Sequence, residues 1–262
     1  MELFGLSAEF VIFLFLIAIL ASLIDTLAGG GGLIVLPALI MSGIPPLQAL
    51  GTNKLQGTMG TATATLMMFK HKKVAWQDVK YMMLTAFLGA VAGTIIIQFI
   101  DTQLLSFIIP GVLFFIGLYF LLSPMASTES KAAKISDKRY QNSISPVIGA
   151  YDGMFGPGTG SFFALAGVSL RGFTLVKATA EAKPLNFATN IASLIVFIAA
   201  GKVVWLIGGL MMIGQVIGAW LGAKCLFIAN PKYIRALVVL MCFAMLIKYA
   251  MTMGWFAALG FN

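Results

Sequence analysis

Charged residues are scarce in this chain of 262 residues. They make up 10% of it, whereas about a quarter of the residues of a soluble domain are charged. Hydrophobic residues make up 60% of the chain. The composition therefore excludes an ordinary soluble domain and predicts a protein of the lipid bilayer.

Cysteine and histidine are also nearly missing. The two cysteines, Cys225 and Cys242, both fall inside apolar runs, where small buried hydrophobic side chains are a simpler interpretation than a disulfide or a metal site. The only histidine, His71, lies among three lysines in a loop. Since no haem, zinc or flavin motif is present either, we expect no cofactor.

Acidic residues are outnumbered, 9 against 17 basic ones. The basic residues lie in short loops between apolar runs, a pattern typical of a cytoplasmic membrane face and not of a nucleic-acid binder. The N-terminus has Glu2 and Glu9, but no basic residue and no small-residue cleavage site around its apolar run. We expect a retained first span and not a signal peptide.

The apolar sequence divides into ten runs. Several reach the roughly 20 residues that cross a bilayer. The runs at 30–43, 144–156 and 158–170 are too short to cross as straight helices, so they predict half-helices, re-entrant hairpins or short packed spans. The ten runs are 10–27, 30–43, 46–69, 76–100, 104–122, 144–156, 158–170, 174–200, 204–228 and 233–253.

The two halves of the chain repeat one another. Asp25 and Asp152 each precede a glycine-rich stretch, and Lys54 and Lys183 each follow eleven residues after a second glycine. The offset is 127 at the aspartates and 129 at the lysines. We therefore predict a first membrane repeat (1–122), a cytoplasmic linker (123–145) that carries no chemistry, and a second repeat (146–262). Duplicated halves with matching glycine and proline interruptions indicate a secondary transporter.

The direction of the repeats depends on whether the short runs cross. Five crossing segments in each half give inverted repeats, whereas short runs that turn back give four spans and parallel repeats. The inverted arrangement places 13 of the 17 basic residues on the cytoplasmic side, so charge favours it. These residues are Lys70, Lys72, Lys73, Lys80, Lys131, Lys134, Lys138, Arg139, Arg171, Lys177, Lys224, Lys232 and Arg235. The predicted fold is an all-α polytopic membrane protein with short broken helices near the midplane.

Lys54 and Lys183 are the candidate centre of a binding site. Each lies eight or nine residues into its run, so about 12–14 Å deep in the bilayer. A charge at that depth is costly and usually marks a substrate or ion path. The alternative is that each lysine only pairs with a carboxylate or caps a broken helix. Hydrogen-bonding neighbours complete the predicted site: Thr52, Asn53, Gln56, Asn186 and Asn190.

The glycine-rich stretches are a second candidate element. Glycine lets backbone approach a ligand closely, and a helix that begins after such a stretch offers free N–H groups to an anion. The candidates are Gly30 and Gly31 in the first half and Gly158 and Gly160 in the second. Two lysines and two half-helix starts together predict a small anionic substrate.

Three acidic residues remain. Asp25 and Asp152 hold equivalent positions and could either carry a coupling proton or cap the broken helices. Glu181 corresponds to Thr52 and breaks the symmetry; we group it with the two aspartates as a candidate ion-coupling residue and leave its role open.

Two glycine pairs have the spacing of a helix-packing motif. They are Gly89 with Gly93 and Gly218 with Gly222. This spacing usually lets helices pack closely; a homo-oligomer interface is the other use we consider.

The chain strongly resembles the TauE/SafE sulfite exporter family, also called TSUP, and within it the YfcA-type bacterial inner-membrane proteins. The resemblance covers nearly the whole chain and rests on DTLAGGGG, GTNKLQ, YDGMFGPGTGS and AEAKPLN. It implies a multi-pass plasma-membrane protein that moves sulfite or related organosulfur anions. Pro184, directly after Lys183, departs from many relatives.

The leading hypothesis is a proton-coupled secondary carrier, and a passive anion channel that uses the same lysines is the alternative. An intramembrane enzyme built on Ser161 lacks a base within reach, since His71 lies in a loop. We therefore expect no enzyme.

Overall fold

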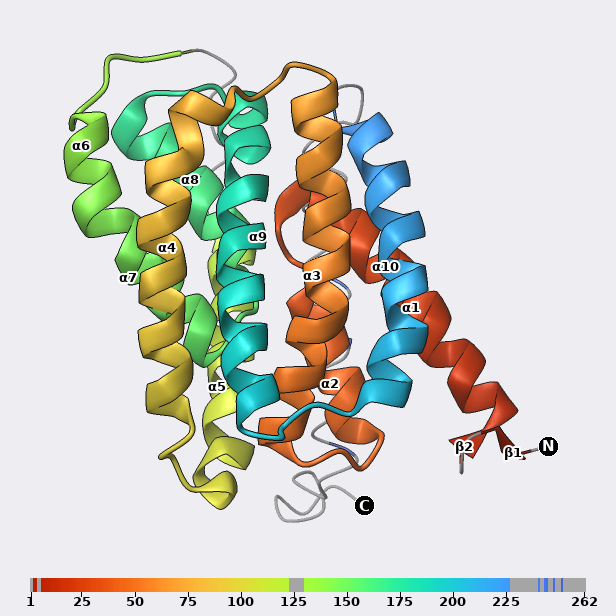
Figure 1. Cartoon of the computed structure of the whole chain (residues 1–262). Helices are drawn as coiled ribbons and strands as arrows, with labels where there is room; N and C mark the ends of the chain where they lie inside the picture. Colours follow the sequence, from red (N-terminus) through yellow and green to blue (C-terminus); the bar gives the residue numbers. More distant parts are fainter. Residues whose placement is uncertain are drawn as a thin grey trace.

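The structure is a computed structural model that describes residues 2–3, 6–122 and 130–226, together with five isolated positions near the C-terminus. A small antiparallel hairpin, β1 (Glu2–Leu3) with β2 (Leu6–Ser7), precedes a bundle of helices (Figure 1). Most of the tenth expected run, 233–253, lies outside the described residues. The helices are α1 (Ala8–Ala28), α2 (Gly32–Met41), α3 (Pro46–Lys70), α4 (Trp76–Ile97), α5 (Thr102–Leu122), α6 (Asp137–Arg139), η1 (Tyr140–Ile144), α7 (Ser145–Met154), α8 (Thr159–Arg171), α9 (Leu175–Ala199) and α10 (Trp205–Cys225).

The predicted all-helical membrane class is confirmed. Four described helices are long and apolar enough to cross a bilayer: Glu9–Ala28, Trp76–Ile97, Leu175–Ala199 and Trp205–Cys225. Large apolar side chains such as Leu66, Leu88 and Phe115 point outward and are more than half exposed. Polar side chains of α3 and α9 are instead buried, so the bundle is apolar outside and polar at its centre, as a bilayer requires.

The short helices turn back at the glycine breaks. Gly29 and Gly156 adopt positive φ angles of 80° and 94°, which only glycine adopts readily. α2 has 10 residues and α8 has 13, so they are about 15 and 20 Å long, too short for a core of about 30 Å. α1 with α2 and α7 with α8 therefore form two helical hairpins. The expectation that short runs that turn back make the repeats parallel is wrong, because α3 and α9 still run antiparallel (Figure 1).

The two hairpin turns meet inside the protein. A Cβ atom placed on Gly29 would lie 2.2 Å from the backbone nitrogen of Ser161, and the Ser161 hydroxyl donates to the carbonyl of Ala28. The equivalent helices α3 and α9 run antiparallel beside these turns (Figure 1). Gly51, near the start of α3, faces Lys202 just beyond the end of α9.

Each hairpin packs on a helix of the other half. Gly89 and Gly93 of α4 lie against the backbone carbonyls of Pro146 and Ala150 in α7. Gly218 and Gly222 of α10 pack in the same way against α1, beside Ile19 and Leu23. Both glycine pairs are thus covered within one chain, which favours the packing use of this spacing over the homo-oligomer use.

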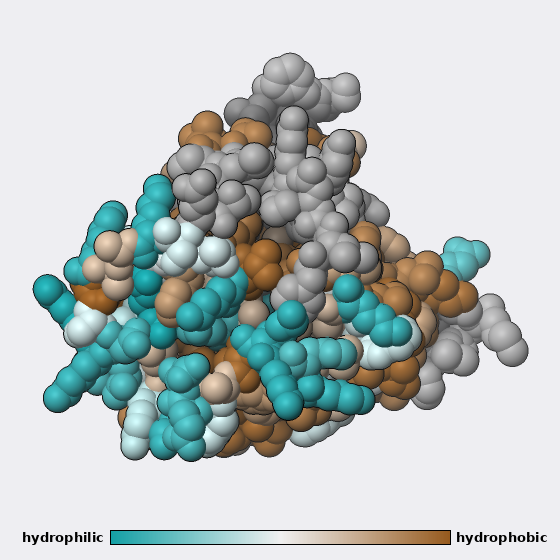
Figure 2. Space-filling view, turned by 90° about the horizontal axis from the view of Figure 1, so that it is seen from above, coloured by the Kyte–Doolittle hydropathy of each residue, from teal (hydrophilic) through white to brown (hydrophobic). Residues whose placement is uncertain are grey.

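Basic side chains gather at one end of the bundle. Figure 2 views this end, which carries the α3–α4 loop, the linker and the end of α10, and shows hydrophilic side chains over it. Among the described loops of the opposite end, only Lys202 is basic. This asymmetry marks the end in Figure 2 as the cytoplasmic one; Lys232, Arg235 and Lys248 lie outside the described residues. Exposed basic side chains at this end are Lys70, Lys72, Lys73, Lys131, Lys134, Lys138, Arg139, Lys177 and Lys224.

The linker is more ordered than its composition suggests. The Lys131 N–H donates to the carbonyl of Gly172 at 2.8 Å, and Asp137 forms an ion pair with Arg171 at 2.7 Å. Helical structure begins at Asp137 and continues through η1 into α7. The described part of the linker therefore docks on the end of α8.

Candidate functional site

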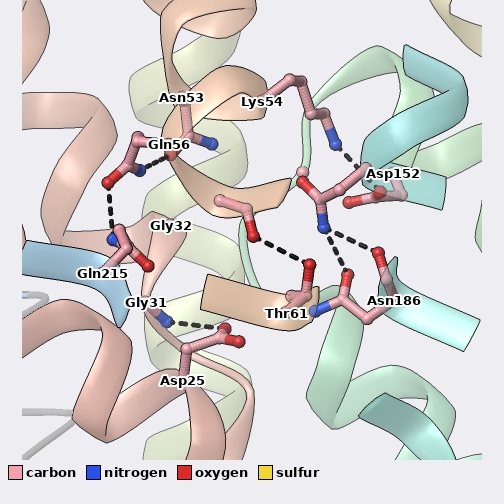
Figure 3. A pocket seen from close by; sticks show the side chains of 13 residues that line it. Asp25, Gly31, Gly32, Asn53, Lys54, Gln56, Thr61, Asp152, Asn186 and Gln215 are labelled. Atoms are coloured by element: carbon pink, nitrogen blue, oxygen red, sulfur yellow. Dashed lines mark hydrogen bonds and ion pairs between the residues drawn. The ribbon is translucent and has the colours of Figure 1, made fainter. Parts of the chain in front are cut away.

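A cavity lies where the hairpin turns meet α3, α9 and α10 (Figure 3). It is small, since the space open to the centre of a water-sized sphere is about 40 Å³, and one water needs about 10–15 Å³ of such space. Both halves of the chain contribute to it. The lining residues are Asp25, Gly31, Gly32, Asn53, Lys54, Gln56, Gly57, Thr61, Asp152, Gly156, Asn186, Asn190 and Gln215.

Lys54 and Asp152 form an ion pair across the two halves. Lys54 Nζ lies 2.9 Å from Asp152 Oδ2, and the two side chains are 1% and 2% exposed. The Thr159 hydroxyl donates to Asp152 Oδ1 at 2.7 Å and so ties the carboxylate to the first turn of α8. A Cβ atom at Gly156 would lie only 3.2 Å from Lys54 Nζ. The glycine turn therefore leaves room for the ammonium group.

Asp25 stabilises the other turn. Its Oδ1 accepts a hydrogen bond from the Gly31 N–H at 3.2 Å, directly before α2. Gly31 and Gly32 both line the cavity, so the N-terminal end of α2 faces it, as expected for an anion site. Asp25 is not itself the N-cap of α2, which is Gly31; it lies in the last turn of α1 and accepts from the N–H of that cap residue.

Side-chain amides cover the remaining wall. Gln215 Nε2 donates to Gln56 Oε1 at 2.5 Å, and Gln56 Nε2 donates to Asn53 Oδ1 at 2.8 Å. Asn190 Nδ2 donates to Asn186 Oδ1 at 3.0 Å. Sequence reasoning missed Gln215, although an uncharged polar side chain inside the apolar run of α10 was a usable signal.

Lys183 does not line the cavity. Its side chain is fully buried, and its Nζ donates to the backbone carbonyl of Asp25 at 2.5 Å. It therefore holds the α1–α2 turn from behind. Thr52 is likewise turned away, since its hydroxyl accepts from the Val204 N–H at 3.0 Å at the start of α10.

Other predicted residues lie close to the cavity without lining it. Gly30, Gly158 and Gly160 belong to the two turns but are absent from the wall. Glu181 is in a separate region, where its Oε2 lies 2.5 Å from Arg171 Nη1. The structure thus brings together eight of the fourteen predicted site residues: Asp25, Gly31, Asn53, Lys54, Gln56, Asp152, Asn186 and Asn190.

The chemistry of the wall suits an anion. It offers one ammonium group, several amides and a helix N-terminus, and the amide and ammonium groups can donate to a ligand's oxygens. Among the described residues no three His, Cys, Asp or Glu side chains come together as metal ligands would. A buried polar cavity between two repeated halves of a helical bundle defines the class of multi-pass membrane transporters.

Comparison with known proteins identifies the family. Residues 14–249 match the family described as "Sulfite exporter TauE/SafE", and the chain belongs to this family. It is similar to a "Probable membrane transporter protein" of Haemophilus influenzae, at 44% identity over 93% of this chain and 95% of the relative. It is 41% identical to the "Probable membrane transporter protein YfcA" of Escherichia coli K12, over 90% of this chain and 87% of that protein. No solved structure is significantly similar. The protein is a multi-pass inner-membrane transporter.

Proposed function

We propose that the protein carries a small anion through the cavity at Lys54, and that sulfite or a related organosulfur anion is exported in this way. The buried ion pair between Lys54 and Asp152 is the observation that supports this most. An ammonium at this depth needs a partner, and an entering anion can replace Asp152 as that partner. The name of the family, sulfite exporter, agrees with this chemistry.

The charges of the wall support coupling to protons. Lys54 contributes one positive charge, whereas Asp25 and Asp152 contribute two negative ones. Lys183, behind the α1–α2 turn, brings the group to neutrality. An added anion leaves excess negative charge in a medium of low dielectric, which costs several kcal/mol. We propose that Asp152 takes up a proton when the anion displaces it, so that anion and proton occupy the site together.

The arrangement of the halves supports a carrier. α3 and α9 run antiparallel beside the cavity, and each hairpin packs on a helix of the other half. Inverted repeats around a central site are the usual scaffold of alternating access. Lys183 takes part indirectly in this proposal, because it holds the turn that carries Asp25 and the start of α2.

The test is transport by the purified chain in liposomes. Sulfite, sulfate, thiosulfate, sulfoacetate and simple carboxylates are offered to the wild type and to Lys54→Ala. We expect saturable uptake of one anion class, accumulation against its gradient when a pH difference is imposed, and loss of both in the variant. Equal transport by Lys54→Ala would contradict the site, and transport that never exceeds equilibration would favour the passive channel.

A further inference from the structure

The amides of the cavity wall form two short chains with a fixed direction. One runs from Gln215 through Gln56 to Asn53, and the other from Asn190 to Asn186. Both are visible in Figure 3. Each chain ends on the side-chain oxygen of an asparagine, so this oxygen is already used as an acceptor.

The direction decides what the asparagines offer to a ligand. An amide has one oxygen that accepts and one nitrogen that donates two hydrogens. Asn53 and Asn186 are 7% and 4% exposed, and within the described residues their Nδ2 atoms have no hydrogen-bond partner. Both are therefore donors left open at the wall of the cavity, where a ligand can accept from them.

We propose that Gln215 is a positioning residue that sets the specificity of this site for oxyanions, through Gln56 and Asn53. Its Nε2 donates to Gln56 Oε1 and so holds that oxygen toward α10, and Gln56 in turn points its Nε2 at Asn53 Oδ1. Asn53 then presents N–H groups and not its oxygen. This inference rests on the proposed anion site and specifies a ligand whose oxygens accept several hydrogen bonds at once.

Gln215 is held firmly enough to play this part. A Cβ atom on Gly60 would lie 2.4 Å from Gln215 Oε1, so α3 approaches the amide closely at this glycine. The Ser22 hydroxyl donates to the backbone carbonyl of Gln215 at 2.6 Å and links α10 to α1 at the same level. Ser22 thus anchors the backbone of Gln215, and the missing side chain at Gly60 makes room for the amide.

A double-mutant cycle tests the proposal. Binding of sulfite, thiosulfate and sulfate to the purified full chain is measured by calorimetry for the wild type, Gln215→Met, Asn53→Ala and the double variant. We expect Gln215→Met to weaken binding about 5- to 10-fold and Asn53→Ala about 10- to 100-fold, the range for hydrogen bonds to a charged group. The double variant should match Asn53→Ala, because Gln215 acts only through Asn53.

Ser22→Ala is the matched control. It removes the bond to the Gln215 backbone and leaves the amide chain, so we expect lower thermal stability and unchanged affinity. If Gln215→Met does not fold, Gln215→Glu keeps the shape but cannot donate when ionised; its loss of affinity should shrink in the Asn53→Ala background. Wild-type affinity in Gln215→Met, or an equal loss with and without Asn53, overturns this inference alone. A wild type that binds none of the anions overturns the proposed function together with it.

Discussion

Lys54 and Lys183 occupy equivalent positions in the two halves but have different partners. Lys54 forms an ion pair with the carboxylate of Asp152 and lines the cavity. Lys183 reaches the equivalent residue, Asp25, but donates to its backbone carbonyl and lies behind the wall. Each lysine therefore contacts the other half of the chain, as the duplication predicts. Only Lys54, however, lines the cavity.

The surroundings of the lysines differ in the same sense. Asn53 and Gln56 of α3 correspond to Ala182 and Leu185 of α9. Those two residues are part of an apolar core cluster. At these two positions α3 is polar and lines the cavity, whereas α9 is apolar and packs in the core. The comparison teaches that a repeated scaffold can supply a symmetric frame for an asymmetric site.

The largest loss of stability is expected at the glycine turn between α1 and α2. Gly29 and Gly43 both adopt positive φ angles, of 80° and 78°. A Cβ at Gly29 would collide with the Ser161 backbone, whereas nothing lies within 4 Å of one at Gly43. We expect Gly29→Ala to lose more than about 4 kcal/mol of stability or to fail to fold, and Gly43→Ala to lose about 1–2 kcal/mol from backbone strain alone.

Thermal melting in detergent and the yield of monodisperse protein measure this difference. Equal stability of the two variants would mean that the hairpin turns do not touch as described. The two halves of the chain would then not contact each other at Gly29 and Ser161.

The lysines themselves give the second prediction. Lys54→Ala should weaken anion binding at least about 100-fold, since it removes a charged donor from the wall. It also leaves Asp152 buried without its partner, at a cost of about 3–5 kcal/mol. Adding Asp152→Asn should recover much of that stability without restoring binding.

Lys183→Ala should show the reverse pattern. We expect a clear loss of stability, because the Asp25 carbonyl and the α1–α2 turn lose their buried donor, and a smaller loss of affinity, because no ligand contact is removed. Calorimetry and melting on both variants separate the two roles. Similar losses of affinity in Lys54→Ala and Lys183→Ala would remove the distinction and return both lysines to a shared site.

Most of the helices were predictable from the sequence, because the lipid bilayer restricts the backbone. Backbone that is buried in lipid must form helices, so the apolar runs predicted nine helices close to their described bounds. Asp25, Lys54 and Asp152 were predicted as site residues, and all three line the cavity. The turning back of α2 and α8 was one of three interpretations that their length allowed, and the charge count had favoured runs that cross. In contrast, the side of each helix that faces the cavity is set by packing. Thr52 faces α10 and Glu181 faces Arg171. The pattern of residues in one sequence does not predict these orientations.

Asp152 provides the third prediction. If it takes up the proton when the anion binds, the affinity of the wild type should rise as the pH falls, by up to about tenfold per unit. In Asp152→Asn the side chain is permanently neutral, so affinity should no longer depend on pH. The measurement is binding of thiosulfate between pH 6 and 8. Asp25→Asn serves as the control and should keep the slope; a slope that persists in Asp152→Asn would place the proton elsewhere.

The smallest effects are expected at Arg171, which holds two carboxylates of unequal exposure. The side chain of Glu181 is 8% exposed and that of Asp137 is 70% exposed. A buried partner of a charge matters more than a solvated one, so Glu181→Gln should lower stability by about 1–3 kcal/mol and Asp137→Asn by less than about 1 kcal/mol. Both variants should keep the pH dependence of anion binding, because Arg171 and Glu181 lie outside the cavity. A Glu181→Gln protein with normal stability and a flattened pH profile would instead make Glu181 the coupling residue, and the proton site would then lie outside the cavity, beside Arg171.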